Sequence, residues 1–418
     1  MLDRLEEKLV RAVEDLLSEE IAFLEEVVNV DSGTFNIEGV REIGRRFARE
    51  LDALGFSTRW ADLPPAMNRA GHLVASRTAA EVRGRRVLLI GHLDTVFEGA
   101  GHRFERAGER ARGAGVTDMK GGDVTILFAL KALHGAGALE GATVRVILTG
   151  DEENPSLPAD VSRRELSLAA LESDVVLSFE PDSGKIAIGR RGLSTWSLDV
   201  AGEQGHSASV LRPPIGAGAV YETARILDGF RRAFSGHSTI TVNPGIVLGG
   251  THVAWDTAKS AGTAAGKFNV VAPRGAVRGD LRFVTDTEQE EAKGRMREIA
   301  AAGLPKTTSR LEFENLAPGW PATPGNRALL EIIDAVSRDL GQGPVEPDDP
   351  ASRGFGDVNF VGTSIPGADG LGVRGWREHG PEESIDLTSL APCTARAAVL
   401  IARLLRTPVG SGGPMILR

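Results

Sequence analysis

Apolar residues recur along the first 190 positions in two alternating patterns, one with the period of a helix and one of short, mostly apolar runs. Helical periodicity covers 2–28 and 37–54, and a further helix is expected at 124–133. The short runs at 86–90, 144–148 and 175–179 are rich in β-branched residues and are followed by polar residues, which is typical of buried parallel strands. The alternation predicts an α/β fold with a mixed, mostly parallel sheet flanked by helices.

A different pattern occupies the middle of the chain. Strand-like segments at 194–200, 238–247, 275–284 and 310–314 are interrupted by helical segments at 218–234 and 287–302. This order, β-α-β-β-α-β, describes a self-contained two-layer unit. Helical periodicity returns at 327–340 and 387–405. We therefore predict a catalytic domain in two parts, 1–192 and 315–418, with an inserted lid domain at 193–314, because residues suited to catalysis lie on both sides of the insertion.

The composition of the chain argues against some classes of binding partner. The 48 basic and 57 acidic residues give a net charge of −9, and no Lys/Arg-rich run could follow a phosphate backbone, so we expect no nucleic-acid partner. The single cysteine, Cys393, excludes an internal disulfide. Acidic residues interrupt every apolar stretch within 1–30, which predicts neither a signal peptide nor a membrane span. A cytoplasmic location without membrane association is the expectation.

Metal-capable side chains follow each of the three predicted buried strands. His92 and Asp94 come after the first strand, Asp151-Glu152-Glu153 after the second, and Glu180 after the third. Ligand sites in open α/β sheets form at this carboxyl edge. Carboxylates packed this closely without cations would have steeply raised pKa values. The sequence therefore predicts a metal site at the sheet edge.

The residue types at these positions suggest individual roles. His92 and Asp94 point to one side of a strand end, so we expect His92 to bind metal and Asp94 to accept its second ring N–H. Asp118 adds a carboxylate on the Gly-rich segment 113–123. Glu152 and Glu153 diverge in direction, so one can bind metal while the other faces the water as general base. Such ligands match zinc, with manganese or cobalt as substitutes, and two ions would hold a hydroxide between them.

The motifs GHLDTV, GVTDMKGG, TGDEEN, LSFEP and WREHGPEESIDL, in this order, resemble those of a known family of co-catalytic zinc metallopeptidases. This is the acetylornithine deacetylase, succinyl-diaminopimelate desuccinylase and glutamate carboxypeptidase family. The resemblance spans most of the chain and is strongest to bacterial glutamate carboxypeptidase, because Glu180 stands where the deacylase branches usually carry Asp. It implies two zinc ions, one held by His92 and Glu180, the other by Glu153 and His379, with Asp118 as the bridge. Glu152 would activate the bridging water.

The same resemblance assigns roles in the lid and the pocket. The family's inserted domain dimerises, so the likeness implies a homodimer formed through the lid. His206, in GEQGHSA, matches the histidine that reaches the partner subunit's site and stabilises the oxyanion. Asn269, in GKFNVVAP, matches a lid asparagine that meets substrate. Gly356 and Asp357, in GFGD, match a loop that lines the pocket, and Arg282 is a candidate for binding an acid group of the substrate.

These residues predict hydrolysis of an amide C–N bond by a metal-bound hydroxide, with Glu152 as general base. The expected substrate is a small N-acyl amino acid, dipeptide or related conjugate. One departure concerns that substrate, since the folate-cleaving carboxypeptidases carry an Arg-rich stretch after the lid and this chain reads NLAPGWP at 315–321. Two alternatives stay open, an aminohydrolase acting on an unusual substrate such as an aromatic amine, and a metal-binding homologue without turnover. The homologue would lack a ligand or the base, and none is missing.

Overall fold

The computed structural model describes residues 1–81, 84–99, 101–257 and 259–408, and the chain divides into two compact units. Unit 1 comprises Met1–Gly189, Trp320–Ser352 and the chain from Gly356 onward, and unit 2 comprises Arg190–Gly319 with Arg353–Phe355. The predicted lid bounds of 193 and 314 fall slightly inside unit 2. The first and last strands of that unit run further than their apolar pattern indicates, because they pair with each other as far as Leu193 and Ala317.

Unit 1 is built on a six-stranded sheet in the order β1-β2-β6-β3-β7-β16. Strands β6, β3, β7 and β16 are parallel to one another. Strand β2 is antiparallel to both of its neighbours, β6 and β1. Their bounds are β1 Ser57–Ala61, β2 His72–Arg77, β3 Val87–His92, β6 Val144–Thr149, β7 Val175–Ser178 and β16 Gly367–Ala368. The mixed, mostly parallel sheet flanked by helices confirms the predicted fold class, and the three predicted strands form its centre.

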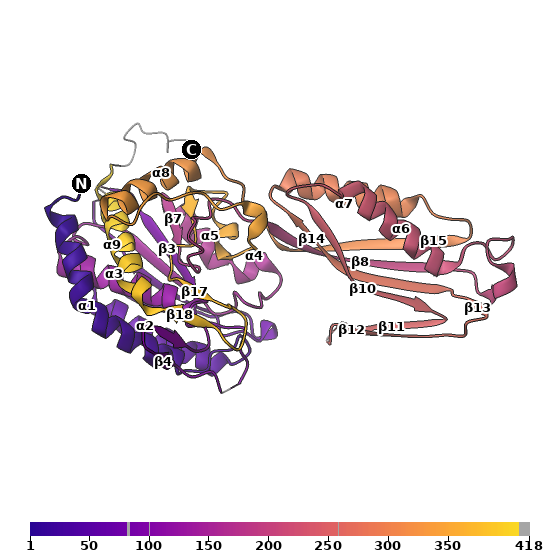
Figure 1. Ribbon diagram of the computed structural model, residues 1–418, viewed down its shortest axis with the longest axis horizontal. Helices are drawn as coiled ribbons and strands as arrows, with labels where there is room; N and C mark the ends of the chain where they lie inside the picture. The colour runs from indigo at the N-terminus through magenta and orange to yellow at the C-terminus, as the bar shows by residue number, and fades with distance from the viewer. Residues whose placement is uncertain (82–83, 100, 258, 409–418) are drawn as a thin grey trace. The chain divides into compact units, whose positions relative to one another are not determined.

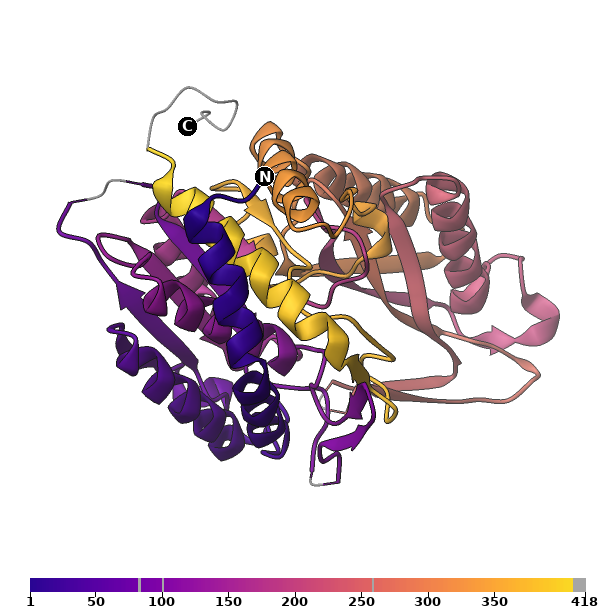
Figure 2. The same cartoon turned by 60° about the vertical axis from the view of Figure 1, so that its left-hand side comes forward.

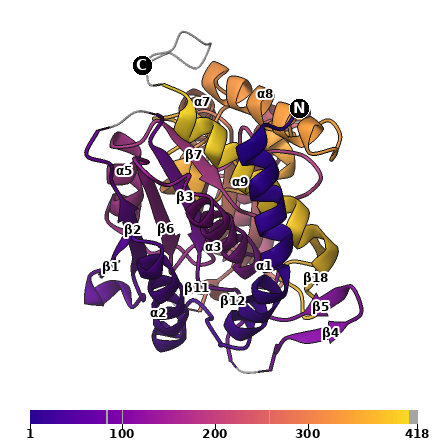
Figure 3. The same ribbon diagram turned by 90° about the vertical axis from the view of Figure 1, so that its left-hand side faces the viewer.

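Successive side chains of the central strands enter two different cores, as strand geometry requires. In β3, Val87 and Leu89 face the larger core, whereas Leu88 and Ile90 face the smaller one, which contains Trp320. Figure 3 shows helices α1, α3 and α9 lying across the sheet. The helices that contribute to the larger core are α1 (Arg4–Val28), α2 (Ile37–Ala53), α3 (Lys120–Gly135), α8 (Pro324–Asp339) and α9 (Leu390–Arg406). The smaller core is covered by α5 (Arg164–Leu171), which follows the single turn α4 (Ala159–Ser162).

The first and last helices of unit 1 lie side by side (Figure 2). An ion pair joins them, with Arg403 Nε 2.9 Å from Glu6 Oε1. The segment Leu387–Arg406 is long and apolar enough to span a membrane by composition alone, but 78% of its apolar window is buried inside the protein. Its apolar character is accounted for by packing against α1 and α3.

A small antiparallel sheet in unit 1 joins segments from before and after unit 2. Its order is β17-β18-β5-β4, and its bounds are β4 Glu105–Ala107, β5 Arg110–Arg112, β17 Gly375–Trp376 and β18 Ser384–Asp386. Ala111 and Ile385 pair across it, and both side chains are buried. The sheet therefore fixes both ends of the loop 377–383, which carries His379, against the segment that leads to Asp118.

Unit 2 has the predicted β-α-β-β-α-β order. Helices α6 and α7 lie on one face of an antiparallel sheet in the order β10-β14-β8-β15 (Figure 1). The bounds are β8 Gly192–Gly202, α6 Gly218–Phe234, β10 Thr241–Gly250, β14 Arg274–Phe283, α7 Asp286–Ala301 and β15 Thr307–Ala317. The pattern did not predict the pair β9 (Gly205–His206) and β13 (Val270–Val271), or the hairpin of β11 (His252–Asp256) and β12 (Ala261–Ala265).

Candidate metal centre and active site

The three central strands place metal-capable side chains at one edge of the sheet. His92 is the last residue of β3, and it pairs with Thr149 at the end of β6, so the turn that carries Glu152 starts beside it. Strand β7 ends at Ser178 and leads directly to Glu180. Because these strands are parallel neighbours, their carboxyl ends coincide, which is the physical basis of the prediction.

Asp118 lies between the two predicted histidine ligands. Its Oδ1 is 3.2 Å from His92 Nε2, and its Oδ2 is 3.1 Å from His379 Nε2. His379 Nε2 is also 3.2 Å from Glu153 Oε2, and His92 Nε2 is 3.9 Å from Glu180 Oε1. The two oxygens of one carboxylate therefore face two separate donor sets, which is the arrangement expected of a bridging ligand.

Ligand atoms from these residues form two overlapping groups. His92, Asp118 and Glu153 place one donor atom each within 4.8 Å of one another, and so do His92, Glu152 and Glu180. Glu153 Oε1 is buried and has no hydrogen-bond partner among the described residues. Buried carboxylate oxygens are rarely left without a partner, so the cluster fits divalent cations.

The electrostatics of the cluster favour a cation. Burial, together with the charge of Glu180, raises the pKa of Glu152 well above its usual range. Hydrogen bonds to Asp118 and Glu153 raise the pKa of His379 to about 11. Burial alone would lower the pKa of His92, but the surrounding carboxylates, of which Asp118 and Asp94 contribute most, together outweigh burial and raise it. Carboxylates buried this closely repel one another, and a bound cation removes that repulsion.

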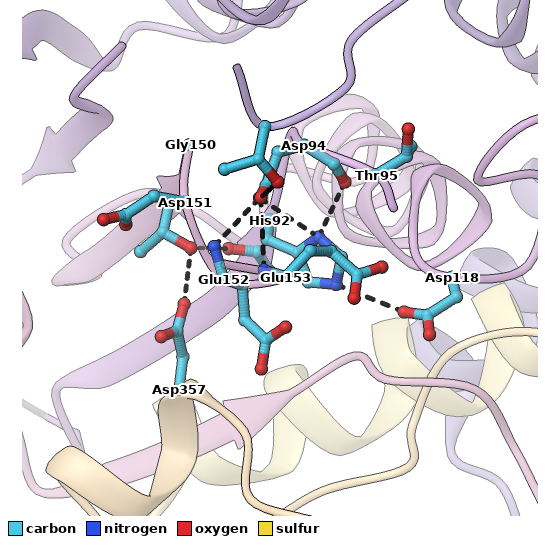
Figure 4. A network of polar contacts seen from close by, with 12 residues as sticks. His92, Asp94, Thr95, Asp118, Gly150, Asp151, Glu152, Glu153 and Asp357 are labelled. Atoms are coloured by element: carbon cyan, nitrogen blue, oxygen red, sulfur yellow. Dashed lines mark hydrogen bonds and ion pairs between the residues drawn. The ribbon is translucent and has the colours of Figure 1, made fainter. Parts of the chain in front are cut away.

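Asp94 contacts His92 through its main chain. His92 Nδ1 is 3.0 Å from the main-chain carbonyl of Asp94 and 3.6 Å from its carboxylate, so the carbonyl accepts the ring N–H of His92. This bond leaves Nε2 as the metal-facing atom. The Asp94 carboxylate accepts hydrogen bonds from the backbone N–H groups of Glu152, at 3.0 Å, and Glu153, at 3.1 Å, and from the Thr34 hydroxyl. Asp94 therefore holds the turn that carries the expected base (Figure 4).

Asp357 does not offer a free carboxylate to a substrate. It is buried, its Oδ1 accepts a hydrogen bond of 2.7 Å from Arg163 Nε, and its other oxygen accepts from the Thr149 hydroxyl. Gly356 is buried as well, and its N–H donates to Asn359 Oδ1. The carboxylate of Asp357 is therefore held by Arg163, a buried arginine that the sequence analysis did not single out. The pocket-lining role of Gly356 and Asp357 stays a prediction.

A glutamate for which the sequence analysis proposed no role positions the bridging ligand. Glu383 accepts hydrogen bonds from the backbone N–H groups of Thr117, at 2.8 Å, Asp118, at 3.0 Å, and Gly115, at 3.2 Å. Burial raises the pKa of Glu383 to about 7. Its place in the motif after His379 was the available sequence signal.

Two of the predicted lid residues lie together and one lies apart. His206 pairs with Val270, and the Ser207 N–H donates to the Asn269 carbonyl at 3.0 Å, so His206 and Asn269 are exposed neighbours. Arg282 pairs with Leu193 at the opposite end of β8 from His206, and its Nε is 3.1 Å from Asp280. At the rise of a β-strand, Arg282 therefore lies about 30 Å from the end of β8 near His206. The oxyanion role of His206 and the substrate-binding roles of Asn269 and Arg282 stay predictions.

The fold and this site define a class of protein. Histidine and carboxylate donors meet at the carboxyl edge of a mixed α/β sheet, and a buried glutamate stands beside them. That combination is typical of metal-dependent hydrolases, in which the ligands hold the ions and a nearby carboxylate handles protons.

Comparisons with known proteins identify the family. Residues 88–403 match the model of peptidase family M20/M25/M40. Carboxypeptidase G2 of Pseudomonas sp. (strain RS-16) is 26% identical over 408 residues, covering 95% of this chain and 92% of the relative. Succinyl-diaminopimelate desuccinylase of Acidiphilium cryptum (strain JF-5) is 26% identical over 372 residues, covering 86% and 92%. Aminopeptidase PepT from Bacillus cereus ATCC 10987 has the same fold, with a TM-score of 0.77, 19% identity and coverage of 93% of this chain and 98% of that one.

The chain belongs to peptidase family M20/M25/M40, and it is a metal-dependent hydrolase. The resemblance found in the sequence motifs is thereby confirmed.

Proposed function

We propose that the protein hydrolyses an amide C–N bond in a small N-acyl amino acid, dipeptide or related conjugate, with two zinc ions, for which manganese or cobalt can substitute. The observation that carries this proposal is the placement of Asp118 between His92 and His379, with Glu152 beside the same cluster. The names of two relatives, a carboxypeptidase and a desuccinylase, describe reactions that break amide bonds, and they support the same chemistry.

Glu152 is the residue proposed to move the proton. Bound ions would supply a water of lowered pKa and polarise the scissile carbonyl. The Glu152 carboxylate takes one proton from that water and delivers it to the leaving nitrogen, so that the C–N bond breaks to give a carboxylic acid and an amine. Figure 4 shows the Glu152 side chain extending away from Asp94, which binds only its backbone.

His206 is the proposed donor to the oxyanion, supplied by a second copy of the chain through a lid-mediated homodimer. Its Nδ1 accepts a hydrogen bond of 3.2 Å from the Ala208 N–H, so the neutral imidazole carries its proton on Nε2. The exposed ring thus presents a donor, as an oxyanion requires. Apolar side chains exposed on the same unit, Val220, Tyr221, Ile246 and Val247, support a docking surface for the second copy.

The structure gives no support to the alternative of an unusual aromatic-amine substrate. That alternative was based on the altered segment 315–321, and its Trp320 is fully buried in the smaller core, where it does not line a substrate pocket.

The role of Glu152 is tested by replacing it with glutamine, which keeps the size of the side chain and removes its basicity. We expect Glu152→Gln to retain its metal while kcat on N-acyl amino acids and dipeptides falls by roughly 10²- to 10⁴-fold. The exposed Glu172→Gln is the matched control and should keep full turnover. Wild-type turnover in metal-loaded Glu152→Gln would remove Glu152 as the base.

The origin of the oxyanion donor is tested by mixing two inactive variants. Glu152→Gln supplies an intact His206, and His206→Ala supplies an intact Glu152, so a mixed dimer contains one complete site if His206 acts on the partner. Random re-pairing at equal amounts should restore about one quarter of wild-type activity. Mixtures that stay as inactive as the separate variants would show that the histidine does not act across subunits.

A further inference from the structure

Arg163 forms a buried ionic network directly behind the turn that carries Glu152. Its Nη1 is 2.6 Å from Asp151 Oδ1, its Nη2 donates to the Asp151 carbonyl at 3.0 Å, and its Nε donates to Asp357 Oδ1 at 2.7 Å. The guanidinium and both carboxylates are almost completely buried, with exposed fractions of 1%, 0% and 5%. The other Asp357 oxygen accepts from the hydroxyl of Thr149, the last residue of β6.

The network holds Asp151, the residue that precedes the proposed base, whereas Asp94 holds the base itself. Asp94 binds the backbone N–H of Glu152, and Arg163 binds both the side chain and the carbonyl of Asp151, the preceding residue. The free oxygen of Asp151 accepts two further bonds from Ser156, which closes the turn. The backbone of Glu152 is therefore held by Asp94 (Figure 4), and that of the preceding residue by Arg163.

Global stability alone does not account for such a network. The desolvation of buried charges offsets most of their attraction, and apolar replacements of similar volume are often neutral or stabilising. An arginine guanidinium holds two carboxylates in a fixed geometry at the same time, which an apolar side chain cannot do. That geometry matters at a catalytic turn, where a displacement of 1 Å can lower the rate about 100-fold.

We infer that Arg163 is a positioning residue for the reaction, which acts through Asp151 and Asp357 to hold Glu152 in its working position toward His92 and Glu180. This inference rests on the proposed role of Glu152 as the base. It adds a role for Asp357 in supporting the base, whereas the sequence resemblance implies only that this residue lines the pocket.

The chain contains a matched control at the other end of the same strands. Arg86 binds Asp174 with two hydrogen bonds, of 2.8 and 3.1 Å, and joins the start of β3 to the start of β7. This pair is likewise an arginine–aspartate fork within unit 1, but it lies at the opposite end of the strands from the metal ligands. Arg86→Lys therefore reports the effect of weakening an arginine fork without touching the catalytic turn.

The experiment measures Arg163→Lys and Arg86→Lys in the full chain loaded with zinc, by kcat, KM, metal content and thermal midpoint. Lysine keeps the charge but cannot hold two carboxylates in a fork. We expect Arg163→Lys to keep both ions and a KM within about threefold, while kcat falls roughly 10- to 100-fold. Arg86→Lys should leave kcat unchanged. Asp357→Asn, which keeps the shape of the side chain, should lower kcat in the same way and serves if Arg163→Lys does not fold.

A double-variant cycle separates positioning from a general structural effect. If Arg163 acts through Glu152, adding Arg163→Lys to Glu152→Gln should cause almost no further loss, because residues acting as a unit are not additive. A multiplicative loss in the double variant, an unchanged kcat, a raised KM alone, or a lost ion would each overturn the inference. Full activity of Glu152→Gln would instead overturn the proposed function, which distinguishes the two failures.

Discussion

Glu20 is a buried carboxyl group whose protonation should control the pH dependence of stability. It lies on α1 against α9, where the Thr394 hydroxyl donates to Oε1, and Oε2 has no hydrogen-bond partner among the described residues. Burial raises the pKa of Glu20 from the usual 4.5 to about 8. The folded chain thus keeps this proton at neutral pH, whereas the unfolded chain loses it.

The sign and size of the effect follow from linkage. A group whose pKa is raised by folding contributes stability that is complete below pH 4.5 and is lost as the pH rises toward about 8. Each pH unit in this window removes about 1.4 kcal/mol, so the free energy of unfolding should fall by something on the order of 5 kcal/mol. Glu20→Gln does not titrate and should remove this slope.

Thermal unfolding between pH 5 and pH 8 provides the assay. At roughly 2 °C for each kcal/mol, the variant should gain up to about 10 °C over wild type at pH 8 and little at pH 5. Glu14→Gln, at an exposed position of the same helix, is the control and should follow the wild-type curve. Parallel curves for wild type and Glu20→Gln would refute the reasoning, because they would mean that the folded chain does not hold the proton.

Two further predictions concern the bridge and the smaller core. Asp118→Asn removes the charge shared by both donor sets, so metal content measured by elemental analysis should fall below one ion per chain, with kcat at least 100-fold lower; two retained ions would contradict the bridging role. Trp320→Ala leaves a cavity in a fully buried site and should reduce the free energy of unfolding by about 3 to 5 kcal/mol, whereas Trp320→Phe should lose less. Equal urea midpoints for both Trp320 variants and wild type would contradict this packing.

The centre of the sheet and the ligands at its edge could be predicted from the residue pattern. The runs that form β3, β6 and β7 carry apolar residues on both faces, with few polar interruptions, which is typical of a strand buried between two layers. Because parallel neighbours end at one edge, the polar residues that follow them had to meet, and His92, Glu153 and Glu180 do so.

The resemblance to a known family was needed for His379. This residue lies in a polar loop between two-residue and three-residue strands, and no periodicity marks it. Its position depends on the pairing of β18 with β5, more than 260 residues earlier in the chain, with Glu383 bound to the Asp118 loop. Pairing between strands this short is set by long-range contacts rather than by local pattern.

The connection between the supporting charges became visible only in the folded chain. Arg163 stands in the pair Arg163-Arg164, which is typical of an exposed helix start, yet it is buried because Asp151 and Asp357 converge on it from distant segments. Local periodicity reports which face of an element avoids water, whereas the pairing of buried charges depends on distances between elements, and those are fixed only when the chain has folded.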